Sequence, residues 1–442
     1  MRRLGNLFFV TGLVVSYYFG YLRGAGVITE EQLRALLVMI ATFLLIATEY
    51  RHKVVAALAG VTALWLLGIL SGEEMIHFLD MEVIGLLFGM MVVVSALRVG
   101  GFFGRITSYL SGLGLSGTQF FLVMTSLTAV LSAFLDNITV SLFMVTIGIV
   151  LSRAMGLNPV PITIATASAA VVGGMGTLVG DPPNIMIAAA TGITFNEFLL
   201  HMGPIAVLAY VVVIGTIALI YRGHFTSDKE RENLEISGEL TDRWITVVGL
   251  ASFMIAVALF VLQDITGISP ATAALYSAVI TMVLSGDRIN DILKDVEWDV
   301  LIFLGSLLVL AGGLEKTGVL HLISDAMVRS IGTNESLMVT VLLWTSAVLS
   351  SVVDNIPVTA SLIPVVAEIV EEIQAPHLWW TLAAGAGIGG IATPLASVPM
   401  LIAYRTLEQE GHKMSFWEFT RIGLILLIVT TLAFNAYLLL RY

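Results

Sequence analysis

The sequence predicts an all-α polytopic membrane protein, and three observations lead to this fold class. Hydrophobic residues make up 57% of the 442 residues and charged residues only 12%, which leaves too little polar surface to coat soluble domains. Apolar runs of about 16 to 22 residues recur along the chain, as expected of helices that cross a bilayer. Two long segments also resemble each other, which predicts an internal repeat.

Composition excludes several classes of protein. The chain has no cysteine, so disulfides, iron–sulfur clusters, thiolate zinc sites and cysteine nucleophiles are excluded. The net charge of -11 comes with no basic cluster, which excludes a nucleic-acid surface. We expect no cofactor and no metal other than a transported Na⁺.

The apolar runs predict the helices in order. A first helix is expected at about 7–22, and further spans at about 35–49, 54–70, 83–99, 161–191, 203–221, 244–263, 270–285, 299–314, 378–403 and 419–440. Two other apolar stretches, at about 118–152 and 336–370, each carry an Asp-Asn pair near the middle. The polar stretch 222–243 is predicted to be a cytoplasmic linker.

The basic residues predict the orientation, because cytoplasmic loops are enriched in Lys and Arg. With the N-terminus inside, 16 of the 21 Lys and Arg residues, Arg98 among them, fall on the inner side. The acidic loop 71–82 falls outside. We therefore expect a multi-pass protein of the cell membrane with a cytoplasmic N-terminus.

Three motifs occur twice, in the same order and about 215–218 residues apart. The pairs are SAFLDNITVSL around Asp136 with LSSVVDNIPVTASL around Asp354, GGMGTLVGDPPNIMIA from Gly173 with GGIATPLASVPMLIAY from Gly389, and the apolar run from Met81 with that from Val296. The predicted organisation is N-terminal scaffold helices at 1–80, a first repeat at 81–221, the linker 222–243, scaffold helices at 244–295 and a second repeat at 296–442.

The number of predicted crossings indicates that the repeats are inverted. Five crossings separate Glu82 from Glu297, the equivalent acids at the entrances of the first spans, and an odd number turns the second copy upside down. Inverted repeats are typical of carriers, because each half can adopt the conformation of the other around a midplane site. Glu82 and Glu297 are interpreted as interfacial charges, with a coupling role as the alternative.

The Asp-Asn pairs predict two hairpins that enter the membrane and break at mid-depth. A carboxylate within apolar sequence costs about 2.5–3.5 kcal/mol on insertion scales, so a function is expected to retain it. A break at Asp136-Asn137, followed by Thr139, or at Asp354-Asn355 would bring helix ends and a carboxylate together. The alternative is an ordinary surface loop between two complete spans.

The Gly- and Pro-rich motifs predict two broken helices, because such sequence does not continue a helix. Unwound backbone offers carbonyls and amides to a ligand. The side-chain candidates for the site are Thr177, Asp181, Asn184, Thr393 and Ser397. The alternative is that the glycines only allow close helix packing.

The motifs contain no Lys or Arg, which favours a cation, a proton or a small neutral solute as ligand. Asp136 and Asp354 are predicted to carry the coupling proton, being neutral when it is bound and charged when it leaves. Asn137 and Asn355 would orient them by hydrogen bonding.

These motifs resemble the ion transporter superfamily, in the branch that holds arsenite/antimonite permeases, NhaD-type sodium/proton antiporters and the pink-eyed-dilution melanosomal protein. GGMGTLVGDPPNIMIA is the most specific element, and FLDNITVSL and VVDNIPVTASLIPVV support it. The resemblance implies a homodimer in which a transport domain of two hairpins and two broken helices moves like an elevator against a scaffold domain. It places Asp136 and Asp354 at the hairpin tips.

This sequence departs from the superfamily at two places. Dicarboxylate carriers have Ser-Asn-Thr at the hairpin tips, where this chain has Asp-Asn, which disfavours citrate or succinate. The second break has Met400 where the first has Asn184, so that the two halves cannot bind a ligand symmetrically.

The sequence therefore predicts a secondary active transporter and no enzyme. Our first choice is proton-coupled efflux of a small inorganic solute, with arsenite or antimonite preferred on resemblance. The alternative is sodium/proton antiport, which the paired carboxylates favour. An intramembrane aspartyl protease is a remote alternative, because Leu178 stands where its Gly-x-Gly-Asp string needs glycine.

Overall fold

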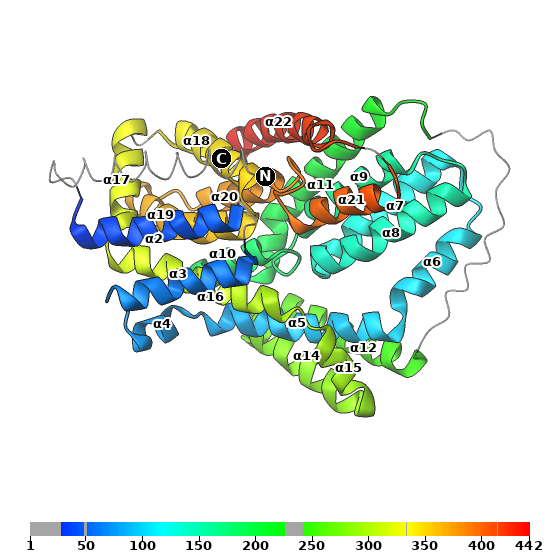
Figure 1. The fold of residues 1–442 in the computed structure, drawn as a ribbon, viewed down its shortest axis with the longest axis horizontal. Coiled ribbons are helices and arrows are strands. Elements are labelled where there is room, and N and C mark those ends of the chain that lie inside the picture. Colours follow the sequence, from blue (N-terminus) through cyan, green and yellow to red (C-terminus); the bar gives the residue numbers. More distant parts are fainter. Residues whose placement is uncertain (1–27, 48–50, 226–241, 333, 413) are drawn as a thin grey trace.

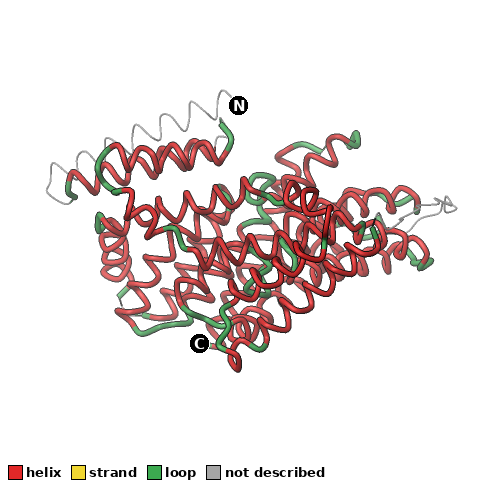
Figure 2. The backbone as a smooth tube through the Cα atoms, turned by 90° about the horizontal axis from the view of Figure 1, so that it is seen from below, coloured by secondary structure: helices red, strands yellow, loops and turns green. Residues whose placement is uncertain are grey.

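The computed structural model describes residues 28–47, 51–225, 242–332, 334–412 and 414–442. The predicted first helix at 7–22 and residues 226–241 of the predicted linker lie outside the described residues. In the described part of the chain, Figure 2 shows helices joined by loops.

The helices, in chain order (Figure 1), are α2 (Glu30–Ala47), α3 (Lys53–Leu66), α4 (Gly72–Phe78), α5 (Met81–Gly100), α6 (Phe102–Gly112), α7 (Gly117–Phe134), α8 (Asn137–Ala154), α9 (Pro159–Gly174), α10 (Pro182–Thr191), α11 (Phe195–Ile220), α12 (Arg243–Val261), α13 (Gln263–Thr266), α14 (Pro270–Leu284), η1 (Gly286–Arg288), α15 (Ile289–Asp295), α16 (Trp298–Lys316), α17 (Val319–Ile331), α18 (Glu335–Val352), α19 (Asn355–Ile373), α20 (Leu378–Gly389), α21 (Val398–Gln409) and α22 (Phe416–Arg441).

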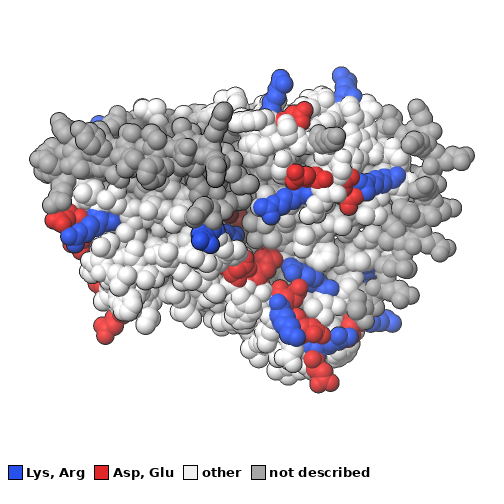
Figure 3. All heavy atoms as spheres, viewed as in Figure 1, with Lys and Arg blue, Asp and Glu red and all other residues white. Residues whose placement is uncertain are grey.

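Eight of the described helices are long and apolar enough to cross a membrane. Many of their apolar side chains are not buried within the protein. In the most apolar stretch of α11, only 28% of the residues are buried. Figure 3 shows that uncharged residues make up most of the described part of one face, where Lys and Arg lie beside Asp and Glu in a few clusters. Large exposed apolar surface of this kind belongs in lipid, so the chain is an integral membrane protein.

Both Asp-Asn stretches are broken where the sequence predicts. α7 ends at Phe134 and α8 begins at Asn137, while α18 ends at Val352 and α19 begins at Asn355. In each pair the two arms pack against each other, as the arms of a hairpin or two complete neighbouring spans do. The Asp at each break caps the second arm by accepting a backbone N–H bond, which explains why the helix starts again at that residue.

The two Gly- and Pro-rich spans are also broken as predicted. α9 ends at Gly174 and α10 begins at Pro182; α20 ends at Gly389 and α21 begins at Val398. The second half of each has proline within its first two positions, where the missing N–H costs nothing because no carbonyl of the helix is available to it. The first break therefore has seven non-helical residues, 175–181, and the second has eight, 390–397.

The two copies of the repeat make equivalent hydrogen bonds. The Ser132 hydroxyl donates to the Ala170 carbonyl at 2.6 Å, and its counterpart Ser350 donates to the Ala386 carbonyl at 2.7 Å. Each bond fastens the first arm of a hairpin to the first half of the broken helix beside it. The same tertiary bonds in both copies support the repeat that the motifs predict.

The helices pack as two groups. The α5 group consists of α2 to α5, α12 and α14 to α16, and the hairpin group consists of α7 to α11 and α18 to α22. In Figure 1, α5, α12, α14 and α15 lie together along the lower edge, with α7, α8, α9 and α21 above them. Each repeat is therefore divided between the groups, since α5 and α16 open the repeats but pack outside the hairpin group.

Two helices that the apolar runs did not predict connect these groups. α6 follows α5 and contacts α8, and α17 follows α16 and contacts α19. α6 is too short to span a membrane and buries only one face, through Phe103, Thr107 and Leu110. A search for long apolar runs misses such helices, because they are short and polar residues interrupt their apolar ones.

An ion pair at one end of the α5 group provides a test of the fold. The Lys316 ammonium lies 2.6 Å from the Glu74 carboxylate and donates to the Ile69 carbonyl at 2.9 Å. The bond from Lys316 lowers the pKa of Glu74 from its ordinary value of 4.5 to about 2, and the Ser71 backbone N–H adds to this effect.

We expect this pair to stabilise the protein at neutral pH and to weaken in acid. A carboxyl whose folded pKa is lowered contributes stability above its unfolded pKa of 4.5, and loses it as the pH falls toward 2. Lys316→Met should therefore melt below the wild type at about pH 6, by a difference that narrows toward about pH 3. Melting curves of the two proteins in detergent would test this, and a difference that stays constant with pH would contradict it.

Candidate functional site

Asp181 is the most enclosed acid of the predicted site, with 3% of its surface exposed. It precedes α10, where an Asp side chain normally caps the helix by accepting an N–H bond from the second or third residue. Here Pro183 has no N–H, and the Asn184 N–H bonds to the Asp181 backbone carbonyl at 3.0 Å. The Asp181 carboxylate makes no capping bond and is left for partners elsewhere.

Both hairpins supply those partners. Asn355 Nδ2, from the second hairpin, donates to Asp181 Oδ2 at 2.9 Å. Asn137, from the first hairpin, lies close to the same carboxyl. Both asparagines are buried, with 4% of their surface exposed. The two Asn residues of the Asp-Asn pairs therefore meet at an acid from the broken helix of the first repeat.

Asp136 and Asp354 are half-buried and lie within electrostatic range of Asp181. Asp136 Oδ1 accepts from the Thr139 N–H at 2.7 Å, and Asp354 Oδ1 accepts from the Ile356 N–H at 3.1 Å. Each carboxylate uses one oxygen at a helix N-terminus, where a negative charge is favourable. Three carboxylates from two repeats thus gather in one region. The sequence analysis assigned the coupling proton to Asp136 and Asp354, but Asp181 is the most buried of the three.

The remaining polar candidates hold the unwound backbone in place. Asn184 Nδ2 donates to the carbonyls of Gly174 at 3.0 Å and Thr177 at 2.8 Å. Ser397 Oγ donates to the Gly390 carbonyl at 2.7 Å, and Gly390 is the repeat counterpart of Gly174. The second repeat has no asparagine at this place, so its serine satisfies the equivalent carbonyl from a different position.

The two threonines of the breaks have equivalent roles. Thr177 Oγ1 donates to the Ala133 carbonyl, and Thr393 Oγ1 donates to the Ser351 carbonyl at 3.0 Å. Each hydroxyl joins a break to the last turn of the neighbouring hairpin arm. Because these donors are used within the protein, the region presents mainly oxygen acceptors to a ligand.

Sequence reasoning missed a basic residue beside the first hairpin tip. Arg98 was counted among the inner-side charges, and it pairs with Asp295 and Glu297 and contacts Thr139. Glu82, the repeat counterpart of Glu297, instead accepts a bond from Ser269 at 3.3 Å. The sequence did offer a signal: Arg98 lies near the end of one apolar span, and the acid Glu297 lies at the start of the equivalent span of the second repeat.

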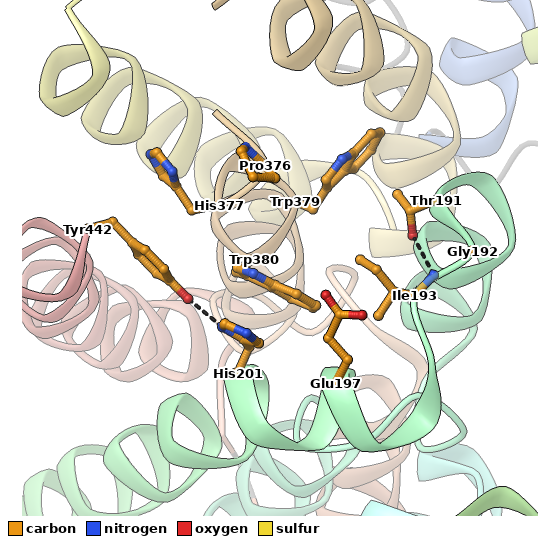
Figure 4. Close-up of a pocket in the computed structure, with 10 residues that line it drawn as sticks. All are labelled: Thr191, Gly192, Ile193, Glu197, His201, Pro376, His377, Trp379, Trp380 and Tyr442. Carbon is orange, nitrogen blue, oxygen red and sulfur yellow. Dashed lines mark hydrogen bonds between the residues drawn. The ribbon is translucent and has the colours of Figure 1, made fainter. Parts of the chain in front are cut away.

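A separate cavity of about 430 Å³ lies where α10, α11, α20 and α22 end or begin (Figure 4). Its walls include His201, stacked on Trp380 with ring centroids 4.6 Å apart, and Tyr442, which bonds to His201 at 2.5 Å. The predicted site residues do not line it. A buried acid with amide partners is the better candidate for binding a transported ion, because it carries a charge that needs compensation.

The fold and its apolar spans define an integral membrane protein, and the known proteins that it is similar to include transporters. The structure resembles the YdaH transporter of Alcanivorax borkumensis, with a TM-score of 0.59 over 93% of this chain and 98% of that one, at 13% sequence identity. At this identity the likeness concerns the fold alone.

The chain belongs to the citrate transporter family, whose model matches residues 43–385. It is 33% identical to a 46 kDa membrane protein of Mycobacterium leprae, over 92% of this chain and 98% of that protein. An uncharacterized transporter of Mycobacterium tuberculosis is 32% identical with the same coverage. The human P protein is 27% identical, over 96% of this chain and 61% of that protein.

These matches confirm the predicted membership of the ion transporter superfamily and the likeness to the pink-eyed-dilution protein. The family and the names of the relatives indicate a transporter rather than an enzyme.

Proposed function

We propose that this protein exchanges protons for a small inorganic solute at Asp181, with Asp136 and Asp354 as the neighbouring acids that share the charge. The observation that carries the proposal is the enclosed Asp181 carboxylate, which accepts a hydrogen bond from the side-chain amide of Asn355 in the second hairpin. A buried carboxylate is stable when it binds a proton or a cation, and costly when it has neither. Competition between the two for one site produces antiport.

A small cation such as Na⁺ suits this site best. The amide of Asn184 and the hydroxyls of Thr393 and Ser397 donate to backbone carbonyls, which leaves carboxylate, amide and carbonyl oxygens as the groups available to a ligand. Oxygen ligands of this kind bind hard cations. Sodium/proton antiport is therefore the function we favour.

Arsenite or antimonite efflux is the second candidate, and the same observation favours it. As(OH)₃ is uncharged and has three hydroxyl groups that can donate hydrogen bonds. A region rich in acceptors can bind these donors while a carboxylate carries the coupling proton.

Citrate, after which the family is named, fits the site less well. A citrate anion would meet the carboxylates of Asp136, Asp181 and Asp354, which repel it. Arg98 is the nearby basic group, and two carboxylates already neutralise it.

We further propose that the hairpin group moves as an elevator against the α5 group during transport. The division of the described helices into these two packed groups supports this movement. The functional unit is proposed to be a homodimer in the cell membrane, with the N-terminus in the cytoplasm.

Transport by the purified protein in proteoliposomes tests these proposals. Under an imposed pH gradient, we expect proton movement that requires Na⁺ or Li⁺ and saturates with its concentration. Proton-coupled movement of arsenite or antimonite without a Na⁺ requirement would support the second candidate. Citrate uptake in the absence of all these activities would overturn the proposed function.

Substitution of the hairpin acids tests whether they take part in coupling. Asp136→Asn and Asp354→Asn retain the oxygen that caps α8 or α19, so helix stability should change by no more than a few tenths of a kcal/mol. Proton-coupled transport should fall roughly tenfold or more in each, a loss of about 1.4 kcal/mol. If both variants transport normally, neither acid carries the coupling proton.

A further inference from the structure

Arg98 lies in the last turn of α5 and joins three segments of the chain. Its Nη1 donates to Asp295 Oδ1 at 3.1 Å, and its Nη2 lies 3.4 Å from Glu297 Oε1. The Asp295 carboxylate also accepts from the Ser95 hydroxyl at 3.0 Å. Asp295 ends α15 and Glu297 precedes α16, so these bonds lie within the α5 group.

The same guanidinium reaches across to the first hairpin. Arg98 Nη2 donates to Thr139 Oγ1, and the guanidinium lies 5.8 Å from the centroid of the Phe143 ring; both partners belong to α8. The Thr139 hydroxyl lies 3.5 Å from Glu297 Oε1. This contact therefore connects the α5 group to the hairpin group at the hairpin tip.

Thr139 links Arg98 directly to the candidate site. The Thr139 backbone N–H is the group that Asp136 binds, while the Thr139 hydroxyl receives the bond from Arg98. Any displacement of Thr139 must therefore affect both the cap of α8 and the Arg98 contact. The arrangement is also enclosed, because the Arg98 side chain is only 17% exposed.

The charges around Arg98 favour this contact. Arg98 brings one positive charge to the two acids Asp295 and Glu297, and Asp136 lies near enough to Glu297 to repel it. Without Arg98, the hairpin tip would face Glu297 and Asp295 directly, and like charges in a partly buried region repel strongly.

We propose that Arg98 is a positioning residue for transport: it holds the first hairpin tip against the end of the α5 group in this conformation, and its bond to Thr139 is released when the hairpin moves. This inference rests on the proposed function, from which it takes the movement of the hairpin group against the α5 group. Arg98 is distinct from the proposed binding residues Asp136, Asp181 and Asp354, because it acts on the hairpin through the Thr139 hydroxyl.

The test uses the absence of cysteine from the chain, which makes a single introduced thiol specific. Ile138 is half-buried beside the tip, and Ile138→Cys would report its release through the rate of maleimide labelling. Adding Arg98→Ala should raise that rate about tenfold, because loss of the contact shifts the population toward the released state. Arg98→Lys keeps the charge but loses the forked geometry, and should give an intermediate rate.

A second variant keeps the test valid if Arg98→Ala folds poorly. Thr139→Val removes the hydroxyl that Arg98 binds while the ion pairs of Arg98 and the backbone bond to Asp136 remain, and it should also raise the labelling rate. Arg105→Ala, an exposed arginine on α6, is the matched control for loss of one positive charge and should leave the rate unchanged.

The outcomes separate this inference from the proposed function. Labelling needs no substrate, so it reports on the hairpin even if none of the tested solutes is transported. Wild-type labelling rates in both Arg98→Ala and Thr139→Val, or slower ones, would overturn the role of Arg98. Faster labelling together with loss of transport in Arg98→Ala, partly restored in Arg98→Lys, is the expected result.

Discussion

Replacement of Asp181 by asparagine is expected to reduce proton-coupled transport strongly while the protein remains folded. Asn has the shape of Asp, and its amide oxygen can accept the bond that Asn355 donates at 2.9 Å. The substitution removes the buried charge and with it the group that binds a proton or a cation. Losing a buried, hydrogen-bonded charge interaction costs about 3 kcal/mol, so transport should fall roughly 100-fold.

The measurement is the initial rate of proton movement in proteoliposomes at a fixed pH gradient, with equal amounts of folded protein. Asp287→Asn is the matched control, since it makes the same chemical change at an exposed position and should transport normally. Wild-type coupling in Asp181→Asn would remove this carboxylate from the mechanism and leave Asp136 and Asp354 as the remaining candidates.

Alanine at Gly173 is expected to cause a large loss of stability. A Cβ atom there would collide with the backbone carbonyl of Ala129, where α9 passes α7. The counterpart Gly389 is equally confined, because its Cβ would lie 2.6 Å from the Ala347 carbonyl. Backbone cannot rotate away as a side chain can, so each substitution should cost about 1–3 kcal/mol or more.

Gly215→Ala is the control for these substitutions. Gly215 lies within α11, has no neighbour within 4 Å of an added Cβ, and should become slightly more stable because alanine favours helix. Thermal unfolding in detergent, followed by tryptophan fluorescence, compares the three variants. Melting temperatures of Gly173→Ala and Gly389→Ala at or above that of Gly215→Ala would show that the helices do not pack this closely.

Part of the site could be predicted because it depends on local chemistry. Asp136 and Asp354 are followed by Asn and stand within apolar sequence, and each becomes a helix cap where the chain breaks. Glycines likewise lie where α9 and α20 end, and prolines lie where α10 and α21 begin. The breaks at the Asp-Asn pairs and at the Gly- and Pro-rich motifs were therefore predicted to within a few residues.

Other parts depend on contacts that sequence spacing does not report. Asn355 and Asp181 are 174 residues apart, and their bond exists because two broken segments fold against each other. Arg98 reads as one of many inner-side basic residues, and its partners Asp295 and Glu297 lie about 200 positions away. The connecting helices α6 and α17 have mixed polarity, and packing rather than length makes them part of the fold.

The amino-acid order alone determined that this chain is helical, resides in a bilayer, carries three motifs twice and has four interrupted apolar segments. These properties follow from hydropathy, helix propensity and capping, which act over a few residues. Only the tertiary structure decided which acid is enclosed and which base holds the hairpin. Burial and charge pairing depend on which distant segments exclude water together. Pro183 has no N–H to donate to the Asp181 side chain, and this carboxylate does not cap α10 but is buried among residues of other segments.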